Sequence, residues 1–445
     1  MKKYNFPAGY SFFASIDRMF KQVKDPIGSM EESLEHFGGT YSVYLGLTRM
    51  IVTQDPDFTT HVLKTNHRNY HKSAIQTKQL GRFLGKGLLT SNGDYWLKQR
   101  RLIQPGFHAD KIQALYGIIK KTIDEFLVDF PVGKEIDVFP LMNKLAFQLV
   151  INTLFDVEVA EEKRNELSRF INEAQAFVVK DVRQPYKRWW FRLSGEMKKN
   201  LDQASRARNI IREIIRERQR HQEKFNDLLD MLLDARYEDT GTPMEEEQII
   251  DEIMVLTIAG HDTTANALAW ALFLLAKHPN QLEKLKEATI DIDLQQTVSS
   301  DPLNCVIQET MRLYPPAWIV DRVSLAADRF SGFSFPANTI VILFYYGMHR
   351  DKKYWEDPDS FLPERFSKSD ASKGRHKAYY PFGAGPRLCI GNNFAMAEMT
   401  IFLQTFIHQF RIITNAQTPV INPLITLKPD RVMLSISRLR NMPSG

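Results

Sequence analysis

A cysteine in a turn-forming stretch is the first residue in this sequence that could do chemistry. Cys389 lies within "YYPFGAGPRLCIGNNFAMAE", residues 379 to 398, where Gly383, Gly385, Pro386 and Gly391 set the backbone. A free cysteine is usually a small buried hydrophobe, so one placed among turn residues is explained better by reactivity than by packing. We therefore interpret Cys389 as a reactive residue.

A polar notch in a long apolar stretch is the second candidate. Residues 253 to 276 are long enough to span a bilayer, but His261 and Asp262 lie near the middle, where charge is costly in lipid. We therefore expect a buried core helix. Its centre, "AGHDTT" at 259 to 264, weakens the helical ladder and could open a kink or bulge. The alternative is that these polar groups only bond back to the helix.

The elements around this notch predict one very long helix. Thr242 is a good N-cap, Pro243 suits the first helical position and Glu245 completes a capping box. The pattern continues to Lys277, which gives about 35 residues, or roughly 50 Å.

The bulk composition is that of a globular protein. The chain has 445 residues, 43% of them hydrophobic and 25% charged, a length that allows several domains or one large core. Two cysteines are too few for a disulfide framework, which fits a reducing compartment. The net charge of +5 permits an acidic partner. The N-terminal segment has no long apolar run, so we expect no secretory signal or membrane anchor and a cytoplasmic location.

The remaining patterns predict a mainly helical protein with a smaller β-rich part around one core. Residues 40 to 53 favour a hairpin, about 55 to 285 are mostly helical, and 338 to 345 are typical of a buried strand. The tail, 411 to 438, has short strands between turns. The basic and aromatic stretch "YKRWWFRL", 186 to 193, could touch a membrane surface; a helix–helix connection covering a pocket is the alternative we favour.

Five motifs in a fixed order identify a family. They are "WLKQRR", "AGHDTT", "ETMRLYPP", "FLPERF" and "PFGAGPRLCIG". With these motifs the chain resembles the cytochrome P-450 superfamily of haem-thiolate monooxygenases over nearly its whole length. The resemblance implies a single domain, 1 to 445, with β-rich portions at about 40–55, 320–345 and 411–438 and no fused reductase. It places haem b between the long central helix and the helix after the cysteine loop.

The resemblance assigns the haem contacts. Cys389 would be the axial thiolate, in a haem-binding loop with Phe382, Gly383, Gly385, Arg387 and Gly391. Trp96, Arg100, Arg322 and Arg387 match residues that bind the haem propionates, a task suited to the guanidinium fork. Cys305 lacks these surroundings, and we interpret it as a packing residue.

The resemblance also assigns a scaffold and a proton path. Glu309, Arg312 and Arg365 match a buried charge triad that supports the fold. Asp262 and Thr263 match an acid–alcohol pair that delivers protons during oxygen activation. Ala259 and Gly260 would leave space for oxygen, and His261 has no ligand role.

The implied reaction inserts one atom of O2 into a C–H bond of an apolar substrate. Electrons would come from a separate ferredoxin or flavodoxin with its reductase, docking near Lys98, Arg101, Arg375 and Lys377. We expect no nucleic-acid partner. The pocket would be lined by residues near Ala259, by 71–89 and by "PPAWIV", 315–320, including Ala317, Trp318, Ile319 and Val320. Fatty acids, terpenoids and carotenoids are the candidate substrates, after the branch that the chain resembles, although the stretch from Pro279 to Glu309 looks short for that branch. The alternatives are a peroxide-driven peroxygenase and a non-catalytic haem sensor.

Overall fold

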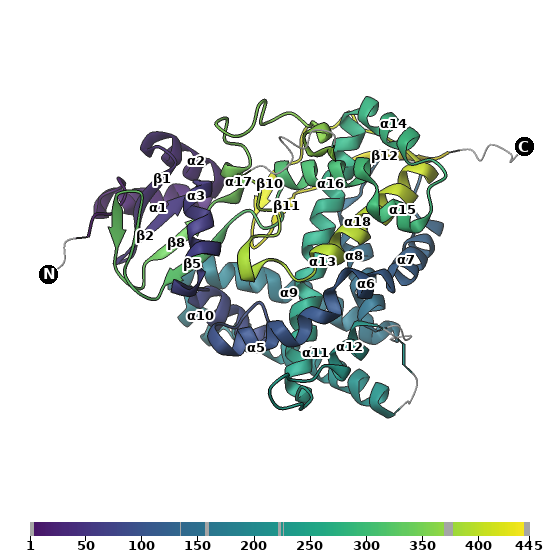
Figure 1. Ribbon diagram of the computed structural model, residues 1–445, viewed down its shortest axis with the longest axis horizontal. Coiled ribbons are helices and arrows are strands. Elements are labelled where there is room, and N and C mark those ends of the chain that lie inside the picture. The colour runs from purple at the N-terminus through teal and green to yellow at the C-terminus, as the bar shows by residue number, and fades with distance from the viewer. Residues whose placement is uncertain are drawn as a thin grey trace, which may run out of the picture.

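Helices make up most of the protein, as the sequence predicts. The computed structural model describes residues 4–133, 135–155, 160–220, 224–225, 227–368 and 377–439 (Figure 1). The α-helices are α1 (Phe12–Lys24), α2 (Pro26–Phe37), α3 (Pro56–Thr60), α4 (Gly81–Leu84), α5 (Gly93–Ile103), α6 (Ala109–Gln113), α7 (Tyr116–Val128), α8 (Phe139–Leu154), α9 (Glu161–Arg183), α10 (Arg188–Leu193), α11 (Glu196–Arg220), α12 (Leu228–Asp234), α13 (Glu246–Lys277), α14 (Pro279–Ala288), α15 (Leu294–Ser299), α16 (Asp301–Leu313), α17 (Tyr345–Met348) and α18 (Asn392–Gln409).

The strands form small sheets on different sides of the helical body, with the β1–β2 hairpin on the left and β12 on the right of Figure 1. The largest has the order β1-β2-β8-β5-β3, with β2 and β8 parallel and the other pairs antiparallel. A second sheet has the order β4-β12-β9, and β6–β7 and β10–β11 are separate hairpins. The strands are β1 (Thr40–Leu45), β2 (Thr48–Thr53), β3 (Tyr70–His71), β4 (Glu135–Asp137), β5 (Val320–Ser324), β6 (Asp328–Phe330), β7 (Phe333–Phe335), β8 (Ile340–Leu343), β9 (Phe410–Ile413), β10 (Ile421–Pro423), β11 (Leu427–Pro429) and β12 (Met433–Arg438).

The long central helix starts later than the sequence predicts. It begins at Glu246 rather than near Thr242, and it ends at Lys277 as expected. The residues of the predicted cap form a turn instead, because the Thr242 carbonyl accepts the Tyr237 N–H at 3.0 Å and Pro243 bridges to Arg236. Tertiary pairing therefore overrides the local capping pattern.

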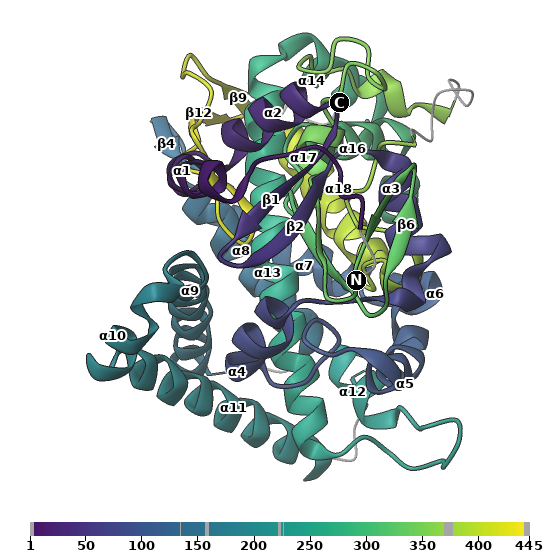
Figure 2. The same cartoon turned by 90° about the vertical axis from the view of Figure 1, so that its left-hand side faces the viewer.

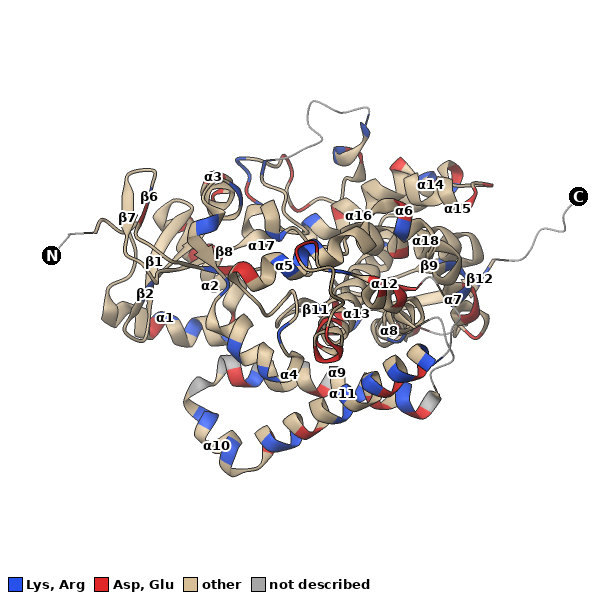
Figure 3. Ribbon diagram, turned by 60° about the horizontal axis from the view of Figure 1, so that its bottom comes forward, with Lys and Arg blue, Asp and Glu red and all other residues tan. Residues whose placement is uncertain are grey.

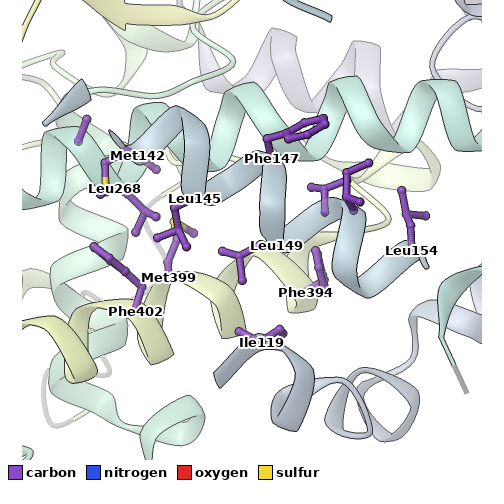
Figure 4. Close-up of a cluster of buried hydrophobic side chains, with 14 of the residues drawn as sticks. Ile119, Met142, Leu145, Phe147, Leu149, Leu154, Leu268, Phe394, Met399 and Phe402 are labelled. Atoms are coloured by element: carbon purple, nitrogen blue, oxygen red, sulfur yellow. The ribbon is translucent and has the colours of Figure 1, made fainter. Parts of the chain in front are cut away.

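Three helices, α8, α13 and α18, pack together in the core of the protein. α13 packs along α8 and against α18, and their facing side chains interdigitate in a dry cluster (Figure 4). From Thr264 to Ala276 every residue of α13 is buried, which explains why its apolar pattern runs on all sides. No helix in the described ranges is long and apolar enough to cross a bilayer.

The other expected elements are present with small differences. The segment from Pro279 to Glu309 holds α14, α15 and most of α16. The strand predicted at 338–345 is shorter, because the chain turns into α17 at Tyr345. The 186–193 stretch connects α9 to α11 through the short turn η5 (Pro185–Lys187) and α10.

Candidate active site

The cysteine loop is held open by backbone constraints. Gly383 and Gly385 have φ values of +73° and +67°, which favour glycine. A side chain at Gly385 would also meet the Leu63 carbonyl oxygen at 2.0 Å, so the close approach of η1 (His61–Thr65) requires glycine there. The Cys389 N–H donates to the Phe382 carbonyl at 3.0 Å and closes the loop. Gly391 is the N-cap residue of α18, which begins at Asn392, three residues after Cys389.

The Cys389 thiol is accessible although it lies in densely packed surroundings. Its side chain has exposed surface, yet protein surrounds it closely enough that burial raises the pKa of the thiol. The Gly391 backbone N–H and the Arg100 guanidinium act in the opposite direction and favour the thiolate. A thiol with exposed surface inside the fold, facing donors that stabilise its anion, suits coordination of a metal.

One face of α13 is also exposed in its middle. Leu256, Ala259, Gly260 and Thr263 are wholly or partly exposed although the helix around them is buried. Positions spaced by three and four residues share one helical face. The Thr263 hydroxyl donates to the Ala259 carbonyl at 2.7 Å, and α13 is assigned as helix without interruption from Glu246 to Lys277. A polar group of the 259–264 segment thus bonds back to its own helix, which was the alternative interpretation of this segment. Thr263 nevertheless lies on the exposed face.

Gly260 also has a packing role, beside the predicted one. A side chain there would meet Val150 Cγ2 of α8 at 3.0 Å, so the glycine allows α8 to pack closely against α13. Ala259 is the residue with the most exposed surface on this face. A small apolar cavity near α13, lined by Phe155, Phe170 and Met254 among others, lies by helical geometry on the opposite face and is no part of this site.

Asp262 and Thr263 point in different directions although they are neighbours. Asp262 is buried and faces β11. It accepts a hydrogen bond from the Thr426 hydroxyl, and one carboxylate oxygen lies 2.5 Å from Lys428 Nζ. The Lys428 side chain is partly exposed. Thr426 and Lys428 could not be predicted as partners of Asp262, because no local motif marks them in the β-rich tail.

His261 is buried and structural. Its Nε2 lies 3.1 Å from the Asn143 carbonyl oxygen, and its ring meets Phe147 edge-on. Burial lowers the pKa of His261, so the neutral imidazole fills space between α13 and α8.

Three cations converge close to the cysteine loop. Arg387 lies over the Trp96 ring, with its guanidinium carbon 3.4 Å from the ring centroid, and donates to the Ser91 carbonyl at 3.1 Å. Arg322 is buried and donates to the Asp321 carbonyl at 2.7 Å. Lys72 Nζ donates to the Leu88 and Leu89 carbonyls at 2.8 and 2.7 Å. We call Lys72, Arg322 and Arg387 the cation cluster. Lys72 was missed in the sequence, where "HKS" at 71–73 gave only a weak signal.

The cation cluster lacks a counter-ion among the described residues. No carboxylate in this part of the chain forms an ion pair with Lys72, Arg322 or Arg387. Burial, with repulsion from Arg322 and Arg100, lowers the pKa of Arg387 to about 9. Burial and repulsion from Arg387 and Arg322 also lower the pKa of Lys72. Buried charges of one sign need an anion, and the two propionates of a haem would supply it. The cations and the thiol therefore fit the predicted cofactor.

Arg100 holds the cysteine loop in this structure, and its contact with a propionate stays a prediction. Its guanidinium donates to the Leu388 carbonyl at 3.0 Å and to Gln104 at 3.1 Å, so in this structure it holds the cysteine loop. Its charge still acts on Cys389 and Arg387. Trp96 and Arg100 share α5, as their spacing predicts.

Glu309, Arg312 and Arg365 form a closed buried cluster, which we call the ion triad. Arg312 donates to both Glu309 carboxylate oxygens at 2.7 and 2.8 Å, and Arg365 Nε lies 3.3 Å from one of them. Arg312 also donates to the carbonyls of His349, Pro358 and Ser360. Each charge is thus paired and hydrogen-bonded.

The predicted pocket lining is wrong at Trp318. This side chain is buried among Phe344 and neighbouring residues, and its indole N–H donates to the Leu424 carbonyl at 3.1 Å. Ala317, Ile319 and Val320 are partly exposed. Trp318 therefore belongs to the core beside the large sheet and cannot line a substrate pocket.

Comparisons with known proteins agree with this geometry. The sequence profile of the family described as Cytochrome P450 matches residues 12–437. The chain is 30% identical to "Cyclooctat-9-en-7-ol 5-monooxygenase" of Streptomyces melanosporofaciens, over 85% of this chain and 84% of that protein. It is 27% identical to "Cyclooctatin synthase" of the same organism, over 92% and 90%, and 26% identical to "Echinocystic acid 23-monooxygenase" of Saponaria officinalis, over 90% and 82%. The fold matches the "cytochrome P450DA heme domain" with a TM-score of 0.86, at 21% identity and 98% coverage of both chains.

Proposed function

Because this chain belongs to the cytochrome P450 family and is a monooxygenase, we propose that it inserts one oxygen atom from O2 into a C–H bond of an apolar substrate. The observation that carries the proposal is the exposed face of α13, which presents Thr263 inside a fold that also exposes the Cys389 thiol. We further propose a cytoplasmic location and haem b as the form of the cofactor.

Residues on two sides would hold the haem. Its iron supplies the redox centre that activates dioxygen. Cys389 would be the axial ligand, with the Gly391 N–H and Arg100 stabilising its thiolate. The cation cluster would bind the propionates, with Trp96 packed under Arg387. Phe382, Gly383 and Gly385 shape the loop, and Ala259 and Gly260 form the opposite wall.

Asp262, Thr263 and Lys428 form a proton path in this proposal. Lys428 is partly exposed and contacts Asp262, so it connects the buried carboxylate to solvent. The Thr263 hydroxyl donates a hydrogen bond to the Ala259 carbonyl. The lone pairs of the Thr263 oxygen are therefore free to hold a water molecule on the exposed face. Asp262 would pass protons to that water by a change of side-chain rotamer away from Lys428.

The substrate would be a fatty acid, terpenoid or carotenoid. The partly exposed residues Ala317, Ile319 and Val320 are apolar, and an apolar wall favours a hydrocarbon body. The names of the two Streptomyces relatives and of the Saponaria relative refer to an alcohol, to cyclooctatin and to an organic acid. A spin-shift binding screen over the three classes tests this choice, and absence of any shift would contradict it.

Electrons would come from a separate ferredoxin or flavodoxin with its reductase. Lys98 and Lys377 are exposed and pair on the surface with Asp239 and Asp57, which leaves them available because such pairs are weak. Arg101 is also exposed, whereas Arg375 lies outside the described residues. Lys98→Glu with Arg101→Glu should slow the first electron transfer and reduce its salt dependence. Unchanged kinetics would contradict this docking site.

The proton path separates this function from its alternatives. In a peroxygenase or a haem sensor, Asp262 and Thr263 would have no catalytic duty. With NADPH and surrogate redox partners, Thr263→Ala should release more peroxide per NADPH, and Asp262→Asn should slow product formation by about 10²–10⁴-fold. Lys428→Met should slow it less, because solvent can still reach the carboxylate.

The matched control is Thr257→Ala. Thr257 makes the same bond to its own helix, donating to the Ile253 carbonyl at 2.7 Å, but it is buried away from the exposed face. It should leave coupling unchanged. If Thr263→Ala behaves like Thr257→Ala, the proposed proton path is wrong.

A further inference from the structure

Two tryptophans stand exposed at a corner of the protein. In the 186–193 stretch, Trp189 and Trp190 are 62% and 53% exposed, and Tyr186 and Leu193 are exposed as well. Only Phe191 is buried, at 1%. The stretch connects two helices as expected, and within it only the Phe191 ring turns into the protein. Exposed tryptophans cost solvation free energy, so a contiguous group of them marks an interaction surface.

The buried Phe191 ring anchors α10 to the neighbouring helix α9. Its ring meets Phe177 of α9 edge-on with centroids 5.6 Å apart, and Lys180 Nζ lies 5.5 Å from its centre. Arg188 pairs with the buried Asp181 at 2.9 Å. The short helix α10 thus lies at the junction of α9 and α11 (Figure 2), and its two tryptophan rings are exposed.

The charged residues between positions 182 and 195 are all positive. From residue 182 to 195 the sequence has no Asp or Glu but contains Arg183, Lys187, Arg188 and Arg192. Lys187 and Arg192 are exposed beside the tryptophans. Basic residues are visible on α10, in contrast to the mixed signs along α11 (Figure 3). Aromatic rings with cations at their rim match the headgroup region of an anionic bilayer.

A second apolar surface lies along the same edge of the molecule. In α1, Phe13 is 81% exposed, and Phe12, Ile16, Phe20 and Val23 are exposed on the same helix. Leu47, at the tip of the β1–β2 hairpin, is 91% exposed. Lys21 and Lys24 stand in the last turn of α1. Figure 2 shows α1 and α10 at the same edge, one above the other.

We propose that α10, supported by α1 and the β1–β2 tip, rests on the surface of a membrane that contains anionic lipid. Trp189 and Trp190 insert among the headgroups while Lys187 and Arg192 contact the anionic lipids. Two separated patches on one edge give a flat attachment that orients the protein. Binding is reversible and weakens with salt, because it combines shallow insertion with screened charge. A lipid surface is favoured over a protein partner because exposed aromatic rings with cations at their rim match a headgroup layer, and because both apolar surfaces lie on one edge of the molecule.

The tryptophan distribution provides the test. The chain has six tryptophans, and Trp96, Trp270, Trp318 and Trp355 are all buried. A quencher in the bilayer therefore reaches only Trp189 and Trp190. Holoprotein is mixed with vesicles of equal parts phosphatidylcholine and phosphatidylglycerol, in which the phosphatidylcholine carries brominated chains. We expect quenching together with co-sedimentation, and much less of both with phosphatidylcholine alone or in high salt.

Matched variants locate the contact. Trp189→Ser with Trp190→Ser should weaken co-sedimentation by at least about tenfold. Lys187→Glu with Arg192→Glu should remove most of the preference for phosphatidylglycerol. The control is Val128→Ser with Ile290→Ser, which alters residues of similar exposure on other elements and should bind like the wild type. The haem content and ferrous–CO spectrum verify folding of every variant.

Three results would overturn the proposal. They are no co-sedimentation with the anionic vesicles at low salt, sedimentation without quenching, and tryptophan variants that bind like the control. A wild-type dimer in solution that the Trp189→Ser, Trp190→Ser variant converts to monomer would also overturn it, because the surface would then contact a second copy of the chain.

Discussion

Two groups of buried arginines in this protein are built in opposite ways. In the ion triad, Glu309 lies between Arg312 and Arg365 and every donor of Arg312 reaches a protein oxygen. In the cation cluster, Arg322 and Arg387 face Lys72 without an ion pair to any described carboxylate. The triad is complete in the polypeptide, whereas the cluster repels itself.

This difference indicates that the ion triad belongs to the scaffold and that the cation cluster belongs to a binding site. A satisfied buried ion group loses much stability when one partner is removed, because the others stay buried and unpaired. A self-repelling group loses little or gains stability when one member is removed, and it loses its ligand instead. The free energy of unfolding and the affinity for haem should therefore respond in opposite patterns at the two places.

The largest effect is expected in the triad. Glu309→Gln leaves Arg312 and Arg365 without a counter-charge and should lower the free energy of unfolding by about 3–5 kcal/mol, measured by denaturant titration. Glu364→Gln is the control, because this exposed carboxylate neighbours Arg365 in sequence and contacts only Lys284 and Gln281 at the surface among the described residues; it should cost about 0–1 kcal/mol. Equal losses would remove the distinction between the two kinds of site.

In the cation cluster, Arg322→Met should spare the apoprotein. Removing a buried cation relieves repulsion, so the free energy of unfolding without haem should stay constant or rise by about 1 kcal/mol. Haem release to a competing apoprotein should accelerate roughly 10–100-fold, since a charge-assisted hydrogen bond of about 1.5–3 kcal/mol is lost. Arg329→Met, an exposed arginine of β6, should change neither. A large loss of apoprotein stability would mean that Arg322 is scaffold.

Glu252, a buried carboxyl that acts on Lys72 of the cluster, gives a pH prediction. Glu252 accepts the Leu88 N–H at 2.9 Å, and burial raises its pKa to about 8. Between about pH 4.5 and 8 the unfolded chain loses this proton while the folded apoprotein keeps it, so stability should fall as the pH rises through that window. Glu252→Gln should flatten the slope, and the exposed Glu238→Gln should retain it. A wild-type slope of opposite sign in this window, unaffected by Glu252→Gln, would contradict the assignment.

The smallest effect is expected from Arg365→Lys. The lysine keeps the positive charge but loses the planar fork that reaches Glu309 and the Asp357 carbonyl. We expect a cost of about 1 kcal/mol by denaturant titration, and unchanged haem release. Faster haem release in this variant would show that the triad and the cofactor site are coupled.

Short motifs made the cysteine loop and the triad predictable from the sequence. Gly383, Gly385 and Cys389 lie within seven residues, and Glu309 and Arg312 are one helical turn apart, so local spacing carries their geometry. Hydrophobic periodicity also predicted the long helix that ends at Lys277 and the division into a helical part and smaller β-rich parts, but not the separate helices.

Partners that meet only through the fold were not predictable. Lys428 meets Asp262 across 166 positions of sequence, and Lys72 meets Arg387 through the folding of distant loops. Trp318 was misplaced because an apolar residue before a strand can face either the core or a pocket. Thr242 was misassigned because a local capping pattern lost to a bridge between Arg236 and Pro243.

The central claim is that the Cys389 thiolate is the axial ligand of the haem. The absorption spectrum of the reduced, CO-bound protein tests it most directly. We predict a strongly red-shifted Soret band for the wild type and for Cys305→Ser, whose cysteine is buried with a pKa raised to about 12. The band should be lost in Cys389→Ser. A Soret band at the position typical of histidine ligation in the wild type, or its red shift surviving in Cys389→Ser, would contradict the account.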